Sequence, residues 1–260
     1  MSKVIIVQGK EPFWMVKKGL EFFAKPFKRK VILKPNLVID KPPPTTTPSE
    51  TVEALAKNYL DDGYEVIVAE GSGYCNTFEA YRKLGYLELS EKYGIKLFDL
   101  NRDDFELVKS SKAFFLKEFE FPSTLKDTYI VSVPVLKEHS LTKVTLSLKN
   151  MLGATLGEKA SIAKKGRFHK RLDESIVDVN LHLKPSLAVI DGRVAGLGGE
   201  LGAKPKELEI MIFSDDLVSA DAVASSYLGK NPLDIKHLKL AQKVGLGIAD
   251  FNKIEIVKIE

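Results

Sequence analysis

The sequence predicts an α/β fold with a mixed, mostly parallel sheet flanked by helices. Short apolar runs typical of buried strands alternate with stretches whose apolar residues recur at helical spacing. Val and Ile dominate the runs, as in KVIIVQ (3–8) and KVILKPN (30–36). The chain has 260 residues, and 44% of them are hydrophobic, which suffices for a substantial core. We therefore expect one α/β domain over residues 1–260.

The first hundred residues show this alternation most clearly. Residues 48–63 give the best helix pattern, because Pro48 suits a first turn, Thr47 can cap it and Gly63 can end it. The other expected helices cover 12–24, 76–86 and 86–94, and the expected strands cover 3–8, 30–36, 64–71 and 95–100.

Residues 103–122 follow a different pattern, in which apolar and charged residues alternate. Such alternation is typical of antiparallel strands with one face in water, so we expect a hairpin insertion there. After it, the sequence predicts strands at 127–136, 184–192, 207–216 and 253–260, and helices at 219–229 and 235–245.

Composition narrows the class of protein. No apolar run reaches the roughly 18 residues that cross a bilayer, and residues 1–14 resemble a first strand rather than a signal peptide. The single cysteine, Cys75, excludes an internal disulfide and a multi-cysteine zinc or iron–sulfur site. We expect a cytoplasmic protein without membrane contact. Abundant Lys and Glu with few Gln are typical of thermophiles.

Positive charge is concentrated in residues 134–172, which hold nine Lys or Arg and two acidic residues. The cluster at 164–171 could form a mobile basic lid that closes over an anion, or a nucleic-acid patch in which Phe168 stacks on a base. A solvated loop is the plain alternative. Because the patch is short and no nucleic-acid module is present, we do not expect nucleic acid as a partner. His169 is a candidate ligand-binding residue in the lid.

Two strand ends supply the first candidate site residues, since ligands of open α/β sheets bind at the carboxyl ends of strands. Lys34 and Asn36 follow one strand, and Thr46 and Thr47 precede a helix whose free N–H groups favour an anion. Ser72 lies in the turn AEGSG (69–73), whose glycines permit close approach of a ligand and whose Glu70 could orient a cation or hydroxyl. A surface lysine, a simple cap and an ordinary turn are the alternatives.

The segment VPVLKEHSLTKVTLSLKNMLG (133–153) supplies the next candidates. We expect Val133–Leu136 to end a strand, and the remainder to be a loop and a helix start that close over a ligand. Lys137 and His139 would emerge at the strand end, followed by Lys149 and Asn150. Imidazole can act as acid, base or metal ligand, and lysine can hold a carboxylate or phosphate. Alternatively, His139 is structural and the lysines are solvated.

Two aspartates complete the set. Asp191 ends a strand before a Gly-rich stretch that suits close contact with a ligand, and it could bind a metal or orient His139. It could also be a plain turn residue. Asp221 lies inside an apolar helix, where a buried carboxylate needs a partner, and we expect one of the basic groups.

Three stretches together, VILKPNLV…AEGSG, VSVPVLKEHSLTKVTLSLKNMLG and AVIDGRVAGLGGELGAKP…SSYLG, resemble the family named domain of unknown function 362. The resemblance spans nearly the whole chain, but it implies no particular activity. Many members carry ferredoxin-like cysteine motifs, whereas this chain has only Cys75, so any cluster would belong to a partner protein. The family-typical positions are Lys34, Asn36, Lys137, His139, Lys149, Asn150 and Asp191.

The leading hypothesis is an enzyme-like protein of unassigned reaction that binds a small carboxylate or phosphate through Lys34, Lys137 and Lys149. His139 would be the acid/base group, and Asp191 its orienter or a metal ligand; a divalent metal is left open. The alternative is a non-catalytic accessory module for a redox or biosynthetic partner. That alternative predicts a broad exposed apolar patch and no pocket containing Lys137 and His139.

Overall fold

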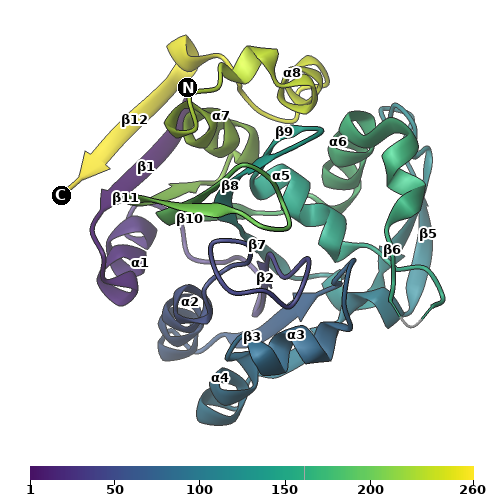
Figure 1. Ribbon diagram of the computed structural model, residues 1–260, viewed down its shortest axis with the longest axis horizontal. Coiled ribbons are helices and arrows are strands. Elements are labelled where there is room, and N and C mark those ends of the chain that lie inside the picture. The colour runs from purple at the N-terminus through teal and green to yellow at the C-terminus, as the bar shows by residue number, and fades with distance from the viewer. Residues whose placement is uncertain (161) are drawn as a thin grey trace.

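The computed structural model describes residues 1–160 and 162–260. Over these residues ten strands form one sheet, of which eight lie in the order β12-β1-β11-β10-β7-β2-β3-β4 (Figure 1). The remaining two branch from it, because β8 pairs with β10 and β9 pairs with β8. The strands are β1 (Ser2–Gln8), β2 (Lys30–Pro35), β3 (Glu65–Glu70), β4 (Lys96–Asp99), β7 (Tyr129–Val133), β8 (Val135–His139), β9 (Lys143–Thr145), β10 (Leu187–Leu197), β11 (Lys204–Ser214) and β12 (Ile254–Ile259).

Most strand pairs of this sheet are parallel, as the sequence predicts. The strands β10, β7, β2, β3 and β4 run in one direction, and β12 is parallel to β1. The strand β11 is antiparallel to both of its neighbours, which makes the sheet mixed. Consequently the carboxyl ends of β2, β3 and β7 open at the same edge, where a ligand site is expected in such a sheet.

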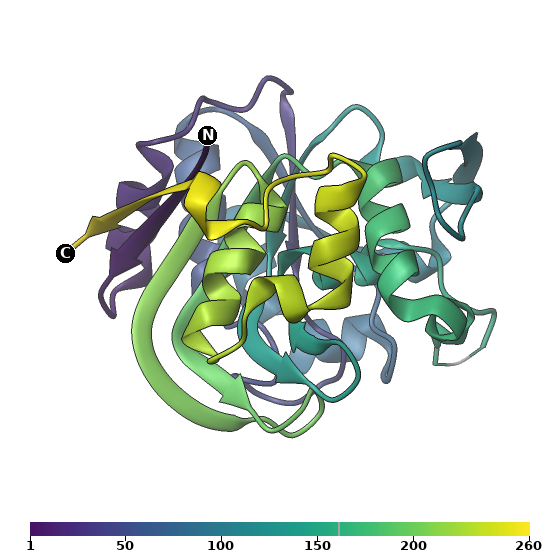
Figure 2. The same ribbon diagram turned by 90° about the horizontal axis from the view of Figure 1, so that it is seen from above.

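Helices cover both faces of the sheet (Figures 1 and 2). Successive strand residues point to opposite faces, so in β1 Val4 and Ile6 join one core, and Ile5 and Val7 join the other. The first core includes residues of α5 (Ser147–Asn150), α6 (Leu172–Leu183), α7 (Leu217–Tyr227) and α8 (Lys236–Lys243), and the second includes residues of α1 (Pro12–Leu20), α2 (Ser49–Asp61), α3 (Thr77–Lys83) and α4 (Tyr86–Tyr93).

The predicted hairpin insertion is confirmed. The strands β5 (Phe105–Lys109) and β6 (Glu118–Pro122) form a separate antiparallel sheet beside α6 (Figure 1). It is held there by the buried carboxylate of Asp178, which accepts hydrogen bonds from the backbone N–H groups of Phe114, Phe115 and Leu116.

Two local predictions differ from the structure. The Gly-rich stretch after Asp191 is a strand rather than a loop, because β10 pairs with β11 as far as Leu197, past an irregularity between Gly192 and Val194. The turn between them is confined to residues 198–203, and Gly198 and Gly199 adopt positive φ there. Thus the sequence overestimates how much flexible loop lies near the site.

The segment after Leu136 is also a strand rather than a loop. The sheet strand β7 ends at Val133, and after Pro134 the chain continues as β8, which leaves β7 and forms an antiparallel hairpin with β9. Proline has no N–H to donate to a ladder, which suits this break. Because Lys137 and His139 are two residues apart on β8, their side chains share one face.

Candidate functional site

A pocket of about 450 Å³ lies at the carboxyl ends of β2 and β3 and is closed by β8, α5 and residues 164–169. The structure therefore brings seven of the predicted site residues into one cavity. Its charged and polar side chains are those of Lys34, Asn36, Glu70, Lys137, His139, Thr145, Lys149, Asn150, Lys164, Lys165, His169 and Glu200.

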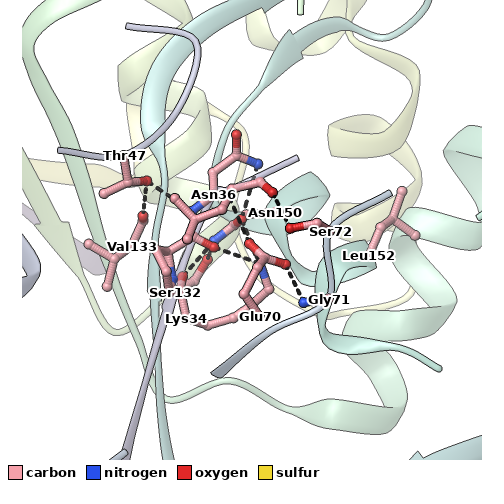
Figure 3. Close-up of polar contacts among 12 residues, drawn as sticks. Lys34, Asn36, Thr47, Glu70, Gly71, Ser72, Ser132, Val133, Asn150 and Leu152 are labelled. Carbon is pink, nitrogen blue, oxygen red and sulfur yellow. Dashed lines mark hydrogen bonds and ion pairs between the residues drawn. The ribbon is translucent and has the colours of Figure 1, made fainter. Parts of the chain in front are cut away.

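Lys34 forms the floor of this pocket with Glu70 (Figure 3). Its Nζ donates to Oε2 of Glu70 at 2.8 Å, to Oδ1 of Asn150 at 3.0 Å and to its neighbour's carbonyl, that of Pro35, at 2.7 Å. An ammonium group has three N–H donors, so all of them are engaged within the protein. Burial lowers the pKa of Lys34, and the adjacent carboxylate of Glu70 opposes that change. Lys34 thus supports the pocket rather than offering a free cation to it.

Glu70 is held from the backbone side as well. Its carboxylate accepts from the N–H groups of Gly71 at 2.7 Å and Leu37 at 2.8 Å (Figure 3). Gly153 packs so closely against this ion pair that a Cβ atom there would overlap Oε1 of Glu70 and lie 2.7 Å from Nζ of Lys34. The floor of the pocket is therefore a buried ion pair whose charged atoms are hydrogen-bonded within the protein.

The two predicted asparagines lie side by side above this floor (Figure 3). Asn150 donates from Nδ2 to the carbonyl of Lys34 at 2.9 Å and to Oγ of Ser132 at 3.1 Å, which fixes its orientation. Its Oδ1 then accepts from Nδ2 of Asn36 at 3.3 Å. The Oδ1 atom of Asn36 is buried and has no hydrogen-bond partner among residues 1–160 and 162–260. The pocket lining thus includes an unused acceptor.

Two further lysines line the pocket without an acidic partner at ion-pair distance among the described residues. Lys137 donates from Nζ to the carbonyl oxygens of Thr45 at 2.5 Å and Glu200 at 3.3 Å. Burial and the charge of Lys149 lower the pKa of Lys137 to about 7. Burial likewise lowers the pKa of Lys149 to about 8. Both amines are therefore partly neutral near physiological pH, which is unusual for lysine.

His139 is a neutral imidazole in this pocket. Its Nδ1 accepts hydrogen bonds from the backbone N–H groups of Leu141 at 3.1 Å and Thr142 at 3.3 Å, which assigns its proton to Nε2. Burial and the charge of Lys149 lower the pKa of His139 to about 3. The ring is consequently a hydrogen-bond donor through Nε2 at neutral pH.

Glu200 is the carboxylate nearest to His139, with Oε2 at 3.9 Å from Nδ1. It accepts from N of Ser140 at 3.2 Å and so ties the turn 198–203 to the β8–β9 hairpin. Glu200 is not among the site residues predicted from the sequence. Its signal is that it is the one acidic residue in the Gly-rich segment 192–203.

Asp191 lies elsewhere. Its carboxylate accepts from the guanidinium of Arg193 at 2.9 Å and from Oγ1 of Thr51 at 2.5 Å. With Arg193 and Glu50 it lines a separate, more open hollow of about 320 Å³. The structure therefore does not bring Asp191 to His139, whose orientation comes from its own turn.

The predicted hydroxyl residues hold loops together. Thr46 donates to the carbonyl of Lys41 at 2.6 Å, and Ser72 donates to that of Leu37 at 2.6 Å. Thr47 accepts from N of Asn36 at 2.9 Å and donates to the carbonyl of Val133 at 2.7 Å. The N-cap residue of α2 is Pro48 and not Thr47, and no side chain caps this helix. These hydroxyls thus position the strand end that carries Asn36.

The basic segment 164–171 contributes Lys164, Lys165 and His169 to the pocket lining, and position 161 just before it lies outside the described residues. Lys165 donates to the carbonyl of Thr155, and burial lowers its pKa to about 7. Phe168 is buried in the core, so the suggestion that it stacks on a base is wrong. The segment thus borders the pocket, and its role as a mobile lid stays a prediction.

The helix α5, which carries Lys149 and Asn150, is fixed by Asp221 of α7. The Asp221 carboxylate accepts from N of Ser147 at 2.7 Å and N of Leu148 at 2.9 Å, and also from the Ser147 hydroxyl. The partner of this buried aspartate is therefore a helix N-terminus and not, as the sequence suggests, a basic side chain. Burial raises the pKa of Asp221 to about 7.

Two broader features concern metals and membranes. Across the described part of the chain, no three His, Cys, Asp or Glu residues are grouped as metal ligands. Among the helices of that same part, none is long and apolar enough to span a bilayer.

Comparisons with known proteins agree with the resemblance. A family model described as domain of unknown function (DUF362) matches residues 31–226, which include all the pocket residues and leave out β1, α1, α8 and β12. The thylakoid-associated protein sll1697 of Synechocystis sp. (strain ATCC 27184 / PCC 6803 / Kazusa) is 24% identical over 240 residues. That match covers 88% of this chain and 71% of the relative.

Proposed function

Because the chain belongs to the DUF362 family, whose description assigns no activity, we propose a function from the pocket itself: binding of a small carboxylate or phosphate, with lysine-based acid–base chemistry. The observation that carries the proposal is that Lys137 and Lys149, with pKa values lowered to about 7 and 8, line the same pocket as His139. Lys137 and His139 come from β8, and Lys149 comes from α5.

An anion would relieve the main electrostatic penalty of this pocket. Burial, and after it the charge of Lys149, lowers the pKa values of both Lys137 and His139. A bound carboxylate or phosphate would favour the charged form of each lysine. Binding near neutral pH should therefore take up protons from solution.

The structure suggests a division of roles that differs from the leading sequence hypothesis. Nε2–H of His139 would donate to an oxygen of the ligand, since Nδ1 is occupied by two backbone donors. Lys137 suits proton transfer better, because an acid or base works best when its pKa lies near the ambient pH. Lys34 and Glu70 would maintain the floor.

The accessory-module hypothesis expects no pocket containing Lys137 and His139, yet both side chains line one. That observation favours ligand binding over a purely docking role. A protein partner, a divalent metal, a thermophilic source and a cytoplasmic location stay predictions, and the relative's name associates that relative with thylakoids.

Isothermal titration calorimetry with sulfate and oxalate tests the proposal. Titrations at pH 7.5 in buffers of different ionisation enthalpy should report net proton uptake. Lys149→Gln should weaken binding about tenfold or more, as expected for loss of a charged hydrogen bond worth roughly 1.5–3 kcal/mol. The matched control is Lys143→Gln, which removes an exposed lysine of the preceding strand β9 that lies outside the pocket lining. Equal affinities in wild type and Lys149→Gln, or binding without proton uptake, would contradict it.

A further inference from the structure

The amine of Lys149 differs from the other buried cations of the pocket. Lys34 donates to three acceptors, Lys137 to two carbonyls and Lys165 to one. By contrast, Lys149 is half-buried in the pocket wall and has no hydrogen bond from Nζ to any residue that the structure describes. Its lone pair, when the amine is neutral, is free to react.

The backbone that carries this amine is held rigidly. Asp221 accepts from the N–H groups at the start of α5, and Asn180 of α6 donates from Nδ2 to the carbonyl of Leu148 at 2.9 Å. On the other side of Lys149, Asn150 is bonded to the carbonyl of Lys34. All these partners are buried, so the position of the amine relative to the pocket is preorganised.

Resting on the anion site proposed above, we propose that Lys149 is a nucleophile that forms an imine with the carbonyl carbon of a keto or aldehyde acid whose carboxylate is held by Lys137. Lysine is activated for this chemistry when it is desolvated, as Lys149 is by burial in the pocket wall. The lowered pKa of Lys149, about 8, supplies the neutral amine near physiological pH.

The reaction balances without an oxidant or reductant. The Nζ lone pair forms the C–N bond, and the carbonyl π electrons move to oxygen, which takes up a proton from the Lys137 ammonium. Nζ then passes one of its two protons to the Lys137 amine, which restores the ammonium. The resulting carbinolamine loses its hydroxyl group and the remaining N–H proton as water, which leaves a C=N bond. Nε2–H of His139 would stabilise the oxygen in this sequence, and the Lys137 ammonium would supply the proton.

The remaining pocket residues indicate which substituent the acid carries besides its carboxylate and its carbonyl group. Val38, Tyr74 and Leu152 line the cavity together with Gly71 and Gly73. A cavity of about 450 Å³ with such a wall accommodates an apolar or aromatic substituent. We therefore expect phenylpyruvate to react better than glyoxylate.

Reductive trapping tests the inference. The intact protein is incubated with glyoxylate or phenylpyruvate at pH 7.5, with and without sodium cyanoborohydride, and analysed by intact-mass and peptide mass spectrometry. One adduct at Lys149, formed only with the reductant, is the expected result. Its yield should rise between pH 6 and 8 as the amine becomes neutral. Lys149→Arg should abolish it, whereas Lys143→Arg, at an exposed lysine outside the pocket lining, should retain it.

Adducts spread over exposed lysines, or equal trapping in Lys149→Arg, would overturn the inference. The peptide map of the wild type decides the site even if a variant fails to fold. Measuring sulfate binding distinguishes a failure of this inference from a failure of the proposed anion site. If sulfate binds in calorimetry but no adduct forms, the nucleophile is refuted and the anion site stands. If Lys149 is trapped and sulfate neither binds nor competes, the anion site is refuted instead.

Discussion

The buried pair of Lys34 and Glu70 offers the sharpest test of how the pocket is built. Their charged atoms are 2.8 Å apart, and the side chains are 0% and 2% exposed. At an effective dielectric constant of about 20, that separation corresponds to an attraction of about 6 kcal/mol, which the desolvation of both groups opposes. Removing one partner leaves the other charge buried without a counter-charge. Lys34→Met or Glu70→Gln should therefore each lower the free energy of unfolding by about 3–5 kcal/mol.

The double variant should cost less than the two single variants together, by about 2–3 kcal/mol, because it leaves no unpaired charge. Urea denaturation followed by far-ultraviolet circular dichroism measures all four proteins. The control cycle uses Lys57→Met and Asp61→Asn, a surface pair 2.7 Å apart whose side chains are 48% and 63% exposed, and should show no resolved coupling. Additive effects of the two buried substitutions would refute the reasoning.

Three further outcomes are expected. Gly153→Ala should lower the free energy of unfolding by about 1–3 kcal/mol in urea titrations, since its Cβ would collide with Glu70, and unchanged stability would show that the floor can relax. Because the pKa of Asp221 is raised to about 7, the folded protein keeps a proton that the unfolded chain loses above pH 4. The stability of the wild type relative to Asp221→Asn should therefore fall by about 4 kcal/mol between pH 4 and 7. A difference that stays constant over this pH range would contradict this. Sulfate affinity should be highest near pH 6 and fall towards pH 9 as Lys137 and Lys149 lose their protons, and a flat calorimetric profile would exclude their participation.

Much of the fold follows from local pattern. Alternation of Val- and Ile-rich runs with helical periodicity predicts the central strands, and the alternating charges of 103–122 predict the separate hairpin. The errors occur where pairing with another strand decides the local structure. Glycines after Asp191 look like a loop, but pairing with β11 continues the strand to Leu197. Hydrogen bonds to the next strand override the weak local preference of glycine.

The candidate site can likewise be predicted from the sequence only in part. Strand ends and the family-typical motifs indicate Lys34, Asn36, Lys137, His139 and Lys149 from the sequence, and the pocket contains all five. Local pattern cannot indicate which of them are free to meet a ligand. That depends on partners that the fold supplies.

Local sequence pattern predicts that strands end in cations, amides and an imidazole on one edge of an α/β sheet. The charge states and contacts of these groups depend on the tertiary structure. It paired Lys34 with Glu70, 36 residues away, and left Lys149 without a hydrogen-bond partner among the described residues. It also brought Glu200 beside His139 and kept Asp191 apart. Charge and reactivity depend on desolvation and on contacts between distant segments, and both exist only once the chain has folded.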